Sequence, residues 1–435
     1  MLLNIKKIIK NIKTRLYESK ESEMKIEIMS PVGSYESLTA AIQAGADAVY
    51  FGIGNLNMRS RSAANFTLDD LERICDIAHR ANIRTYLTVN TIIYNNEIDE
   101  MHRLVDAAKR VGVSAIIASD LAVITYARSI GVEVHISTQC NISNIEAVRF
   151  YAQFADVMVT ARELPLSQVK EITDFIRQND IRGPKGELVQ IEIFAHGALC
   201  MSVSGKCYLS LDNAGYSANR GACLQLCRRQ YLVKDLESDT ELVVDNKYIM
   251  SPKDLCTIDF LDKIVDSGVR VLKIEGRGRS ADYVLTVTEC YREAVQAIAD
   301  GTYTPDRIAE WKERLATVFN RGFWDGYYLG RRLGEWTEGY GSQATEKKVY
   351  LGLIKNYFTR ISVAEALLQT AETLCPGDEV MVMGETTGVY RAIVDELRLE
   401  RDPVAEVHQG DRFSFATTAT VHRGDKLYKI VKSEL

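Results

Sequence analysis

The sequence predicts an α/β protein: a (β/α)8 TIM-like barrel with a cysteine-rich insertion, followed by a small C-terminal antiparallel β-barrel domain. From Lys25 onward, eight short apolar runs alternate with amphipathic stretches, which is typical of parallel strands separated by helices. The eight units span about 270 residues, close to the usual size of a (β/α)8 barrel. From residue 347 the apolar residues alternate with period two, which indicates antiparallel strands. A doubly wound open sheet is the competing topology, but it usually has fewer strands and a glycine-rich first turn.

Each expected barrel strand is a short apolar run. The eight runs are Ile26–Met29, Ala48–Phe51, Thr85–Val89, Ala115–Ala118, Val132–Ser137, Val157–Thr160, Val189–Phe194 and Val271–Ile274. Apolar residues at three- and four-residue steps predict helices over Leu68–Ala81, Ile98–Val111 and Leu166–Gln178. We assign residues 25–300 to the barrel and residues 195–268, between the seventh and eighth strands, to the insertion. Active sites of such barrels lie at the carboxyl ends of the strands, so we expect the chemistry at this insertion.

The remainder of the chain is expected to form a linker and a second domain. Residues 301–346 read as a helical and aromatic linker, with a helix over Arg307–Phe319. Residues 347–435 are assigned to the C-terminal β-barrel domain, with turn signals such as Pro376–Asp378. Its expected strands are Lys348–Tyr357, Asp378–Met383, Thr387–Glu396, Asp411–Thr417 and Asp425–Val431.

Residues 1–24 differ from the rest of the chain. Isoleucine and leucine residues from Ile5 to Leu16 recur at helical spacing, and basic residues fill the positions between them. One interpretation is a basic amphipathic helix that contacts a membrane surface or RNA phosphates. The other is an appendage from an early start codon, with Met24 as the true start.

The composition is that of a globular protein rather than a disordered or membrane-spanning one. Of the 435 residues, 46% are hydrophobic and 26% are charged, and the formal net charge is −6. No run of about 18 apolar residues occurs, so we expect no transmembrane helix. The first residues do not resemble a signal peptide, and nine cysteines are too few for a disulfide scaffold in so long a chain. We therefore expect a cytoplasmic protein, in which clustered cysteines bind metal or act in catalysis.

The insertion holds five of the nine cysteines, in the pattern Cys200-x6-Cys207-x15-Cys223-x3-Cys227 followed by Cys256. Four thiolates bind either zinc or a 4Fe–4S cluster. Zinc sites favour two closely spaced pairs, and only Cys223 and Cys227 have that spacing, so the pattern favours an iron–sulfur cluster. We choose Cys200, Cys207, Cys223 and Cys227 as the ligands. Cys256 is the reserve, because Ser251–Leu255 before it reads as the start of a helix in which Cys256 would be buried.

Charged and polar residues follow several of the predicted strands. Arg162 and Arg277 can bind a carboxylate in bidentate fashion, and so can Arg59 and Arg61. His196 can donate to a substrate oxygen or titrate near neutral pH. The structural alternatives are a histidine bonded to backbone and ion pairs that close the barrel rim. We assign catalytic roles to His196, Arg162, Glu275 and Arg277, and substrate-binding roles to Arg59, Arg61, Asn90 and Lys273.

Several motifs resemble those of one known family. They are Ser30–Ser34, Ala44–Gly52, Tyr86–Asn90, Phe194–Ser210, Ser251–Leu255 and Lys273–Arg277. The segment Phe194–Ser210 resembles the signature of the peptidase U32 family, the collagenase-like proteins. The resemblance covers roughly residues 25 to 340, and the C-terminal domain resembles that of the branch that hydroxylates tRNA uridine at carbon 5. Cys256 is not shared by all members, and the basic N-terminal extension is not part of the family pattern.

The resemblance implies an oxygen-independent hydroxylase that carries a 4Fe–4S cluster. Such proteins act on ubiquinone precursors, on ribosomal RNA or on the wobble uridine of tRNA, and prephenate is implied as the hydroxyl source. The tRNA branch resembles this chain most closely, so the implied reaction converts the wobble uridine to 5-hydroxyuridine. The implied partners are tRNA, a small dicarboxylate donor, and a protein that supplies electrons or assembles the cluster.

A U32-type peptidase is the alternative function. A cysteine protease pairs an activated thiolate with a base, and Cys200 lies four residues from His196. A metalloprotease typically uses a histidine-rich zinc site, and the sequence has no HExxH motif. A single nucleophile does not require four clustered cysteines, so the cluster explains more residues. A non-catalytic RNA-binding or scaffold role is the third hypothesis.

Overall fold

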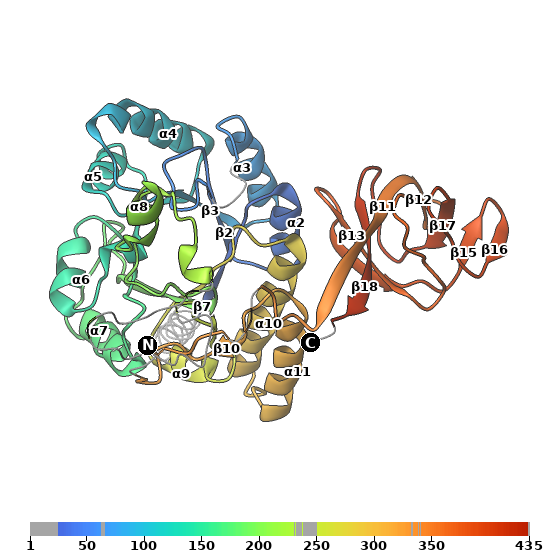
Figure 1. Cartoon of the computed structure of the whole chain (residues 1–435). Coiled ribbons are helices and arrows are strands. Elements are labelled where there is room, and N and C mark those ends of the chain that lie inside the picture. Colours follow the sequence, from blue (N-terminus) through green and yellow to red (C-terminus); the bar gives the residue numbers. More distant parts are fainter. Residues whose placement is uncertain are drawn as a thin grey trace, which may run out of the picture.

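The computed structural model describes residues 25–433, apart from 62–65, 230, 232–236, 238–249, 332–333, 338 and 340. The basic helix expected within residues 1–24 lies outside the described residues. The described part forms a barrel with a C-terminal antiparallel sheet beside it (Figure 1). None of its helices is long and apolar enough to cross a membrane.

Eight parallel strands form a closed barrel, which confirms the predicted TIM-like fold. They are β1 (Glu27–Pro31), β2 (Ala48–Gly52), β3 (Arg84–Val89), β4 (Ala115–Ala118), β5 (Val134–Ile136), β6 (Val157–Val159), β7 (Gln190–Gly197) and β9 (Val271–Ile274). Consecutive strands pair from β1 to β7, and β9 pairs in parallel with both β7 and β1, which closes the sheet. The competing open sheet is therefore wrong for this chain.

Helices surround the barrel strands (Figure 1). They are α2 (Tyr35–Gln43), α3 (Asp70–Arg80), α4 (Ile98–Val111), α5 (Leu121–Ser129), α6 (Ile145–Tyr151), α7 (Leu166–Gln178), α9 (Leu261–Asp266) and α10 (Ala281–Ala299). Side-chain caps fix where several of them begin: Ser34 accepts from the backbone N–H of Ser37 in α2, and Asn144 accepts from that of Ala147 in α6. Gly112 ends α4 in the left-handed conformation, which glycine adopts without strain.

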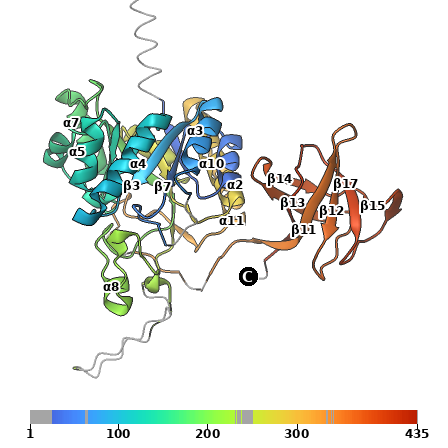
Figure 2. The same cartoon turned by 90° about the horizontal axis from the view of Figure 1, so that it is seen from above.

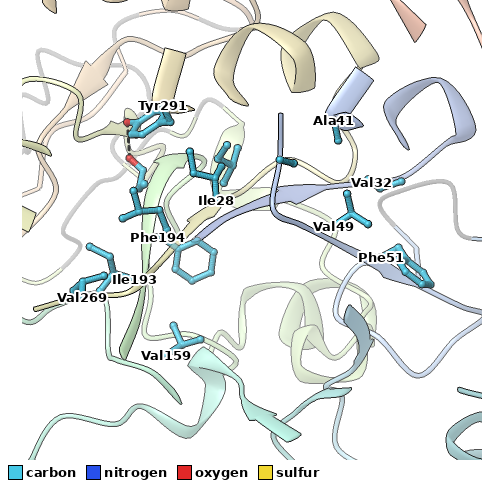
Figure 3. Close-up of a cluster of buried hydrophobic side chains, with 14 of the residues drawn as sticks. Ile28, Val32, Ala41, Val49, Phe51, Val159, Ile193, Phe194, Val269 and Tyr291 are labelled. Atoms are coloured by element: carbon cyan, nitrogen blue, oxygen red, sulfur yellow. Dashed lines mark hydrogen bonds between the residues drawn. The ribbon is translucent and has the colours of Figure 1, made fainter. Parts of the chain in front are cut away.

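Buried apolar side chains from strands and helices form the barrel core. Figure 3 shows part of it, with Ile28 from β1, Val49 and Phe51 from β2, and Ile193 and Phe194 from β7. A second cluster lies on the strands alone, and its members are Met29, Ala48, Tyr50, Tyr86, Ala115, Ile117, Val157 and Val271. The barrel is thus packed with side chains, as is usual for this fold, and does not form an open channel.

The described part of the insertion between β7 and β9 contains short elements. They are α8 (Leu209–Ala214), the 3-10 turns η3 (Ala218–Arg220) and η4 (Leu226–Arg228), and β8 (Asp254–Cys256). Figure 2 shows α8 beyond one end of the barrel. We refer to residues 198–229 as the cysteine loop.

The helix start expected at Ser251–Leu255 is wrong, because this segment leads into strand β8. β8 pairs antiparallel with the end of β7, where His196 lies opposite Cys256, and parallel with β10 (Phe323–Trp324). These pairings also explain why β7 runs three residues beyond the expected Phe194. Strand pairing between distant segments thus prevails over the local helix signal.

Residues 301–346 contain a helix that packs on the barrel. Helix α11 (Pro305–Thr317) begins two residues before the expected Arg307, because Thr304 caps it and Pro305 occupies its first turn. Trp311 and Leu315 are buried in the barrel core, and α11 contacts α10.

The C-terminal residues form an eight-stranded antiparallel sheet, as expected for this domain. Its strands are β11 (Glu346–Phe358), β12 (Val363–Leu368), β13 (Glu379–Gly384), β14 (Gly388–Ile393), β15 (Leu397–Leu399), β16 (Asp402–Val404), β17 (Arg412–Ala416) and β18 (Lys426–Lys432). Their order is β14-β13-β18-β11-β12-β17-β15-β16. The sequence analysis missed β12, β15 and β16. β12 contains two alanines and a glutamate, which have low strand propensity, and it is held by pairing with β11 and β17.

The turn between β13 and β14 docks on helix α2 of the barrel. Gln43 donates from Nε2 to the carbonyl of Thr387 at 2.8 Å and accepts from the backbone N–H of Val389 at 3.1 Å. Arg73 in α3 pairs with Glu385 at 2.9 Å. These contacts fix the C-terminal sheet against the side of the barrel.

Candidate active site

A cavity of about 230 Å³ opens where the carboxyl ends of the barrel strands meet the cysteine loop. Residues that follow six of the eight barrel strands line it, together with residues of the loop. They include Met58 and Arg59 after β2, Asn90 after β3, Ser137, Thr138 and Gln139 after β5, Arg162 after β6, Ala198 and Leu199 after β7, and Glu275, Arg277 and Arg279 after β9. The cavity therefore occupies the end of the barrel where active sites of this fold lie.

All four cysteines chosen as ligands line this cavity. They are Cys200, Cys207, Cys223 and Cys227. Each is a free thiol, and none of the four is fully buried. Burial, with a smaller effect of the other three thiols, raises the pKa of the Cys227 thiol to about 11 against the opposing effect of Arg228. The structure thus gathers four sulfur atoms, far apart in sequence, in one electrostatic environment.

Two arginines fix the cysteine loop, Arg220 to the barrel and Arg228 to the start of the loop and the segment before β8. Arg220 forms a two-pronged ion pair with Glu97, donates to the carbonyl of Ile92 at 2.6 Å and lies 4.0 Å from the ring centre of Tyr94. Arg228 donates to the carbonyl of Leu199 at 2.6 Å and to the hydroxyl of Ser251 at 2.9 Å. The cysteines are therefore positioned by contacts of their neighbours and not by one regular element.

Gly221, two residues before Cys223, packs closely against the segment that follows β2. It has φ +78°, and an added Cβ would lie 2.3 Å from the carbonyl oxygen of Asn57 and 2.3 Å from Oγ of Ser60. A glycine is required here for both reasons.

Among the described residues, Glu275 is the one carboxylate that lines the cavity. Arg59 donates to its Oε1 at 2.6 Å, and the hydroxyl of Tyr50 is 3.4 Å from its Oε2. Burial alone would raise its pKa, but the charges of Arg59, Arg162 and Arg277 outweigh that effect and lower the pKa to about 2. Glu275 is therefore ionised near neutral pH, where it holds the Arg59 guanidinium in place and cannot act as a proton donor.

Seven cationic side chains line the same cavity. They are Arg59, Arg162, Arg228, Lys273, Arg277, Arg279 and Arg321. Lys273 is neutralised by Glu192 at 2.9 Å, and Arg279 and Arg321 share the buried Asp254 at 3.9 and 3.3 Å.

Among the described residues, neither Arg162 nor Arg277 has a carboxylate partner within 4.0 Å. Arg277 donates instead to Oγ1 of Thr88 at 2.9 Å and to Oδ1 of Asn57 at 3.0 Å. Burial lowers the pKa of Arg277 to about 10, which still leaves it charged at neutral pH. The guanidinium of Arg162 lies 3.8 Å from the ring centre of Phe194, and its buried Nε has no hydrogen-bond partner. These two arginines can bind a carboxylate without displacing an existing ion pair.

Uncharged hydrogen-bonding side chains form another part of the wall. They are Thr88, Asn90, Ser137, Thr138 and Gln139, from the segments at the ends of β3 and β5. Thr138 donates to the hydroxyl of Ser204 in the cysteine loop at 3.4 Å, so this part of the wall touches the loop.

The structure places three of the predicted site residues outside the cavity lining. His196 is 1% exposed and packs against the rings of Tyr291 and Phe323, and burial lowers its pKa to about 3. Its predicted catalytic role is not supported, because a buried neutral imidazole behind the wall cannot reach a substrate. Arg61 stacks on the ring of Tyr216, with 4.9 Å between guanidinium and ring centre. Cys256, the reserve ligand, is buried in β8.

Arg228, Arg279 and Arg321 line the cavity but were not predicted from the sequence. Arg279 is two residues beyond Arg277, and Arg228 is next to Cys227. Both could therefore have been predicted from their proximity in sequence to predicted site residues. Arg321 could not, because strand β10 brings it to the cavity from a segment after α11.

Comparison with known proteins decides the family. A model of peptidase family U32 matches residues 33–338. The chain belongs to the peptidase U32 family. A protein of Porphyromonas gingivalis named collagenase is 57% identical over 94% of this chain and 98% of its own length.

Other U32 relatives are named for RNA hydroxylation. A tRNA hydroxylation protein of Bacillus subtilis is 32% identical over 83% of this chain and 84% of its own length. A 23S rRNA 5-hydroxycytidine synthase of Escherichia coli is 32% identical over 85% of this chain and 54% of its own length. The family thus contains proteins named for proteolysis and proteins named for RNA hydroxylation. The choice between these two functions for this chain depends on the geometry of its site.

Proposed function

We propose that this U32 protein is an oxygen-independent RNA hydroxylase that converts the wobble uridine of tRNA to 5-hydroxyuridine. The observation that carries the proposal is one cavity at the barrel mouth, lined by four cysteines and by seven cations against a single carboxylate. Relatives named for tRNA and rRNA hydroxylation support it.

A 4Fe–4S cluster is the cofactor proposed for the four cysteines. A single zinc ion with Zn–S bonds of about 2.3 Å would draw four sulfur atoms to within about 3.8 Å of one another. Among the described residues, no three His, Cys, Asp or Glu side chains are arranged to hold a metal ion. Four cysteine thiolates are the usual ligand set of a 4Fe–4S cluster, and all four thiols line this one cavity. When bound, it would supply electron-transfer or Lewis-acid chemistry at the cavity.

The cations of the wall fit a small dicarboxylate donor, for which we propose prephenate. Arg162 and Arg277 would each bind a carboxylate group, because both are charged and lack a carboxylate partner among the described residues. Glu275 holds the guanidinium of Arg59, and Glu192 holds Lys273, so these two cations are oriented before the donor binds.

The target base has to leave the RNA stack to reach the cavity. A cavity of about 230 Å³ is too small to admit an RNA helix. Extrusion of a nucleotide is the usual solution for enzymes that act on a base. The proposed partner protein that supplies electrons or assembles the cluster would act from outside this cavity.

A U32 peptidase is the second candidate, because the relative that is 57% identical is named collagenase. Proteolysis by Cys200 would need a base near its thiol. His196, the base that the sequence offered, is buried outside the cavity lining with its pKa lowered to about 3. This placement weighs against a Cys200–His196 pair and in favour of the hydroxylase.

Anaerobic purification followed by iron and sulfide analysis tests the cofactor. We expect about four irons per chain, lost in a Cys223→Ala variant. Mass spectrometry of tRNA nucleosides from a deletion strain, with and without the wild-type gene, then tests the reaction: 5-hydroxyuridine should disappear and return. Iron-free protein that cleaves gelatin would overturn the hydroxylase and support the peptidase.

A further inference from the structure

We propose that Gln139 presents amide protons to the substrate base and thereby selects uridine over cytidine. The inference rests on the proposed function, since it requires a pyrimidine base in the cavity. It is carried by a chain of hydrogen bonds through Asn90 and Ser137, in which each proton can be assigned.

The series of hydrogen bonds begins at a backbone N–H group, which can only donate. The backbone N–H of Met58 donates to Oδ1 of Asn90 at 3.1 Å, so the amide nitrogen of Asn90 lies on the other side of the group. That Nδ2 donates to Oγ of Ser137 at 3.3 Å. The Ser137 hydroxyl in turn donates to Oε1 of Gln139. Gln139 is left with its amide nitrogen directed away from Ser137.

The cysteine loop holds Gln139 in this position. A Cβ added to Gly205, which lies between Cys200 and Cys207, would be 2.9 Å from Cγ of Gln139. Gln139 lines the cavity, and among the described residues its Nε2 has no partner. The fixed side chain thus offers two N–H donors to whatever lies in the cavity beside the cysteines.

The ligand atom that binds the Gln139 amide nitrogen must be a hydrogen-bond acceptor, and an uncharged acceptor is favoured. The adjacent side chains of Asn90, Ser137 and Thr138 carry no charge, whereas the cations that suit a carboxylate lie after β2 and β6, within and after β9, before β10 and in the cysteine loop. A neutral amide cannot compete with free guanidinium groups such as Arg162 and Arg277 for an anion. A carbonyl oxygen of a base is the matching ligand.

The position of the reaction indicates which carbonyl oxygen this is. Hydroxylation at carbon 5 requires that this carbon face the cysteines, and carbon 4 is its ring neighbour. The other ring neighbour, carbon 6, carries only hydrogen, so the hydrogen-bonding group next to carbon 5 is the substituent on carbon 4, and we assign this substituent to Gln139, which lies against the cysteine loop. In uracil that substituent is the acceptor O4, and in cytosine it is a donor amino group. Gln139 therefore pairs with uracil and opposes cytosine.

Binding of short RNAs tests the assignment. We would measure affinities for two single-stranded oligonucleotides that differ only in one uridine or cytidine within a purine context. Wild type should prefer the uridine RNA by about tenfold. Gln139→Leu should bring the ratio to about one, and Gln139→Glu should reverse it, because a carboxylate accepts from the cytosine amino group. Gln225→Glu, which adds the same charge to the cavity wall, should weaken both RNAs without changing their ratio.

Ser137→Ala provides a second test that leaves Gln139 in place. Without the Ser137 hydroxyl the side-chain amide of Gln139 can rotate. The ratio of the affinities for the uridine and cytidine RNAs should therefore fall about threefold, while the circular dichroism spectrum is unchanged. Equal ratios in wild type and Gln139→Leu, or no preference in wild type, would overturn the inference even if the wild type hydroxylates RNA. Failure of the proposed function is recognised separately, by the absence of 5-hydroxylated pyrimidine from RNA of the wild-type strain.

Discussion

Glu275 is the residue on which the electrostatics of the cavity depend. Its carboxylate contacts Arg59 directly and also senses the charges of Arg162 and Arg277, which lower its pKa from 4.5 to about 2 against the opposing effect of burial. A folded-state pKa below the unfolded value means that the carboxylate stabilises the fold above pH 4.5. That contribution is lost as the pH falls toward 2.

We therefore expect Glu275→Gln to lower the free energy of unfolding at pH 7 by up to ~3 kcal/mol. The difference from wild type should shrink between pH 4.5 and pH 2, where Glu275 itself becomes protonated. Urea denaturation at pH 7, 4 and 3 measures this. As a control, Glu385→Gln removes an ion pair whose side chains are both more than half exposed and should cost less than ~1 kcal/mol. A difference that is the same at pH 7 and pH 3 would contradict the explanation.

The positions of individual residues relative to the strands show how much of the site can be predicted from the sequence. Lys273 lies near the end of β9, and Arg162, Glu275 and Arg277 lie within three residues after a strand, and the closed barrel brings the carboxyl ends of its strands to one rim. His196 also follows the apolar run of its strand, but β7 continues through it by pairing with β8, and this turns the histidine into a buried strand residue. Sequence position indicates that a residue reaches the rim, whereas pairing between distant segments decides whether it faces the cavity.

At the scale of elements, the cysteine loop depends on close contacts more than on secondary structure. Between β7 and η4 it contains one short helix, α8, and its docking relies on Arg220, Arg228 and the close approach of Gly221. The four cysteines that the sequence spacing groups together all line one cavity. The spacing carried no information on the docking contacts, since Glu97 and Asn57 belong to loops after other strands.

We expect Gly221→Ala to displace the loop and weaken cofactor binding while the barrel stays folded. An alanine Cβ would overlap the carbonyl oxygen of Asn57 and the hydroxyl of Ser60, each at 2.3 Å. Gly215→Ala is the matched control, because Gly215 also has a positive φ, +68°, but open space around its Cβ position. Its cost should be limited to backbone strain of ~1 kcal/mol.

Iron content after anaerobic reconstitution measures the effect, and we expect a loss of at least half for Gly221→Ala and little change for Gly215→Ala. In metal-free protein, the rate of Cys223 alkylation gives a reading independent of the cofactor, and it should rise in Gly221→Ala alone. Equal iron content and equal alkylation rates in the two variants would show that the approach of Gly221 does not position the cysteines.

At the scale of the whole molecule, the question is how the C-terminal sheet is held beside the barrel. Met381, Met383 and Val389 of β13 and β14 pack against the barrel core, and Lys348 of β11 pairs with Asp282 of α10. Gln43 is the polar centre of this contact, since its amide both donates and accepts backbone hydrogen bonds across it. The period-two pattern predicted the sheet, but nothing in the local sequence of α2 predicted that its last residue would bind it.

Replacing Gln43 by Leu should uncouple the two parts of the molecule without unfolding either. The carbonyl of Thr387 and the N–H of Val389 would lose their partners at a half-buried contact, at a cost of about 1–3 kcal/mol. We expect thermal unfolding by calorimetry to change from one transition to two, with the sheet melting first, and protease cleavage between the barrel and the sheet to become faster. Gln178→Leu is the control, because Gln178 likewise ends a helix, α7, but is exposed and far from the sheet. A single transition shifted equally in both variants would mean that the apolar contact of Met381, Met383 and Val389 alone holds the sheet in place.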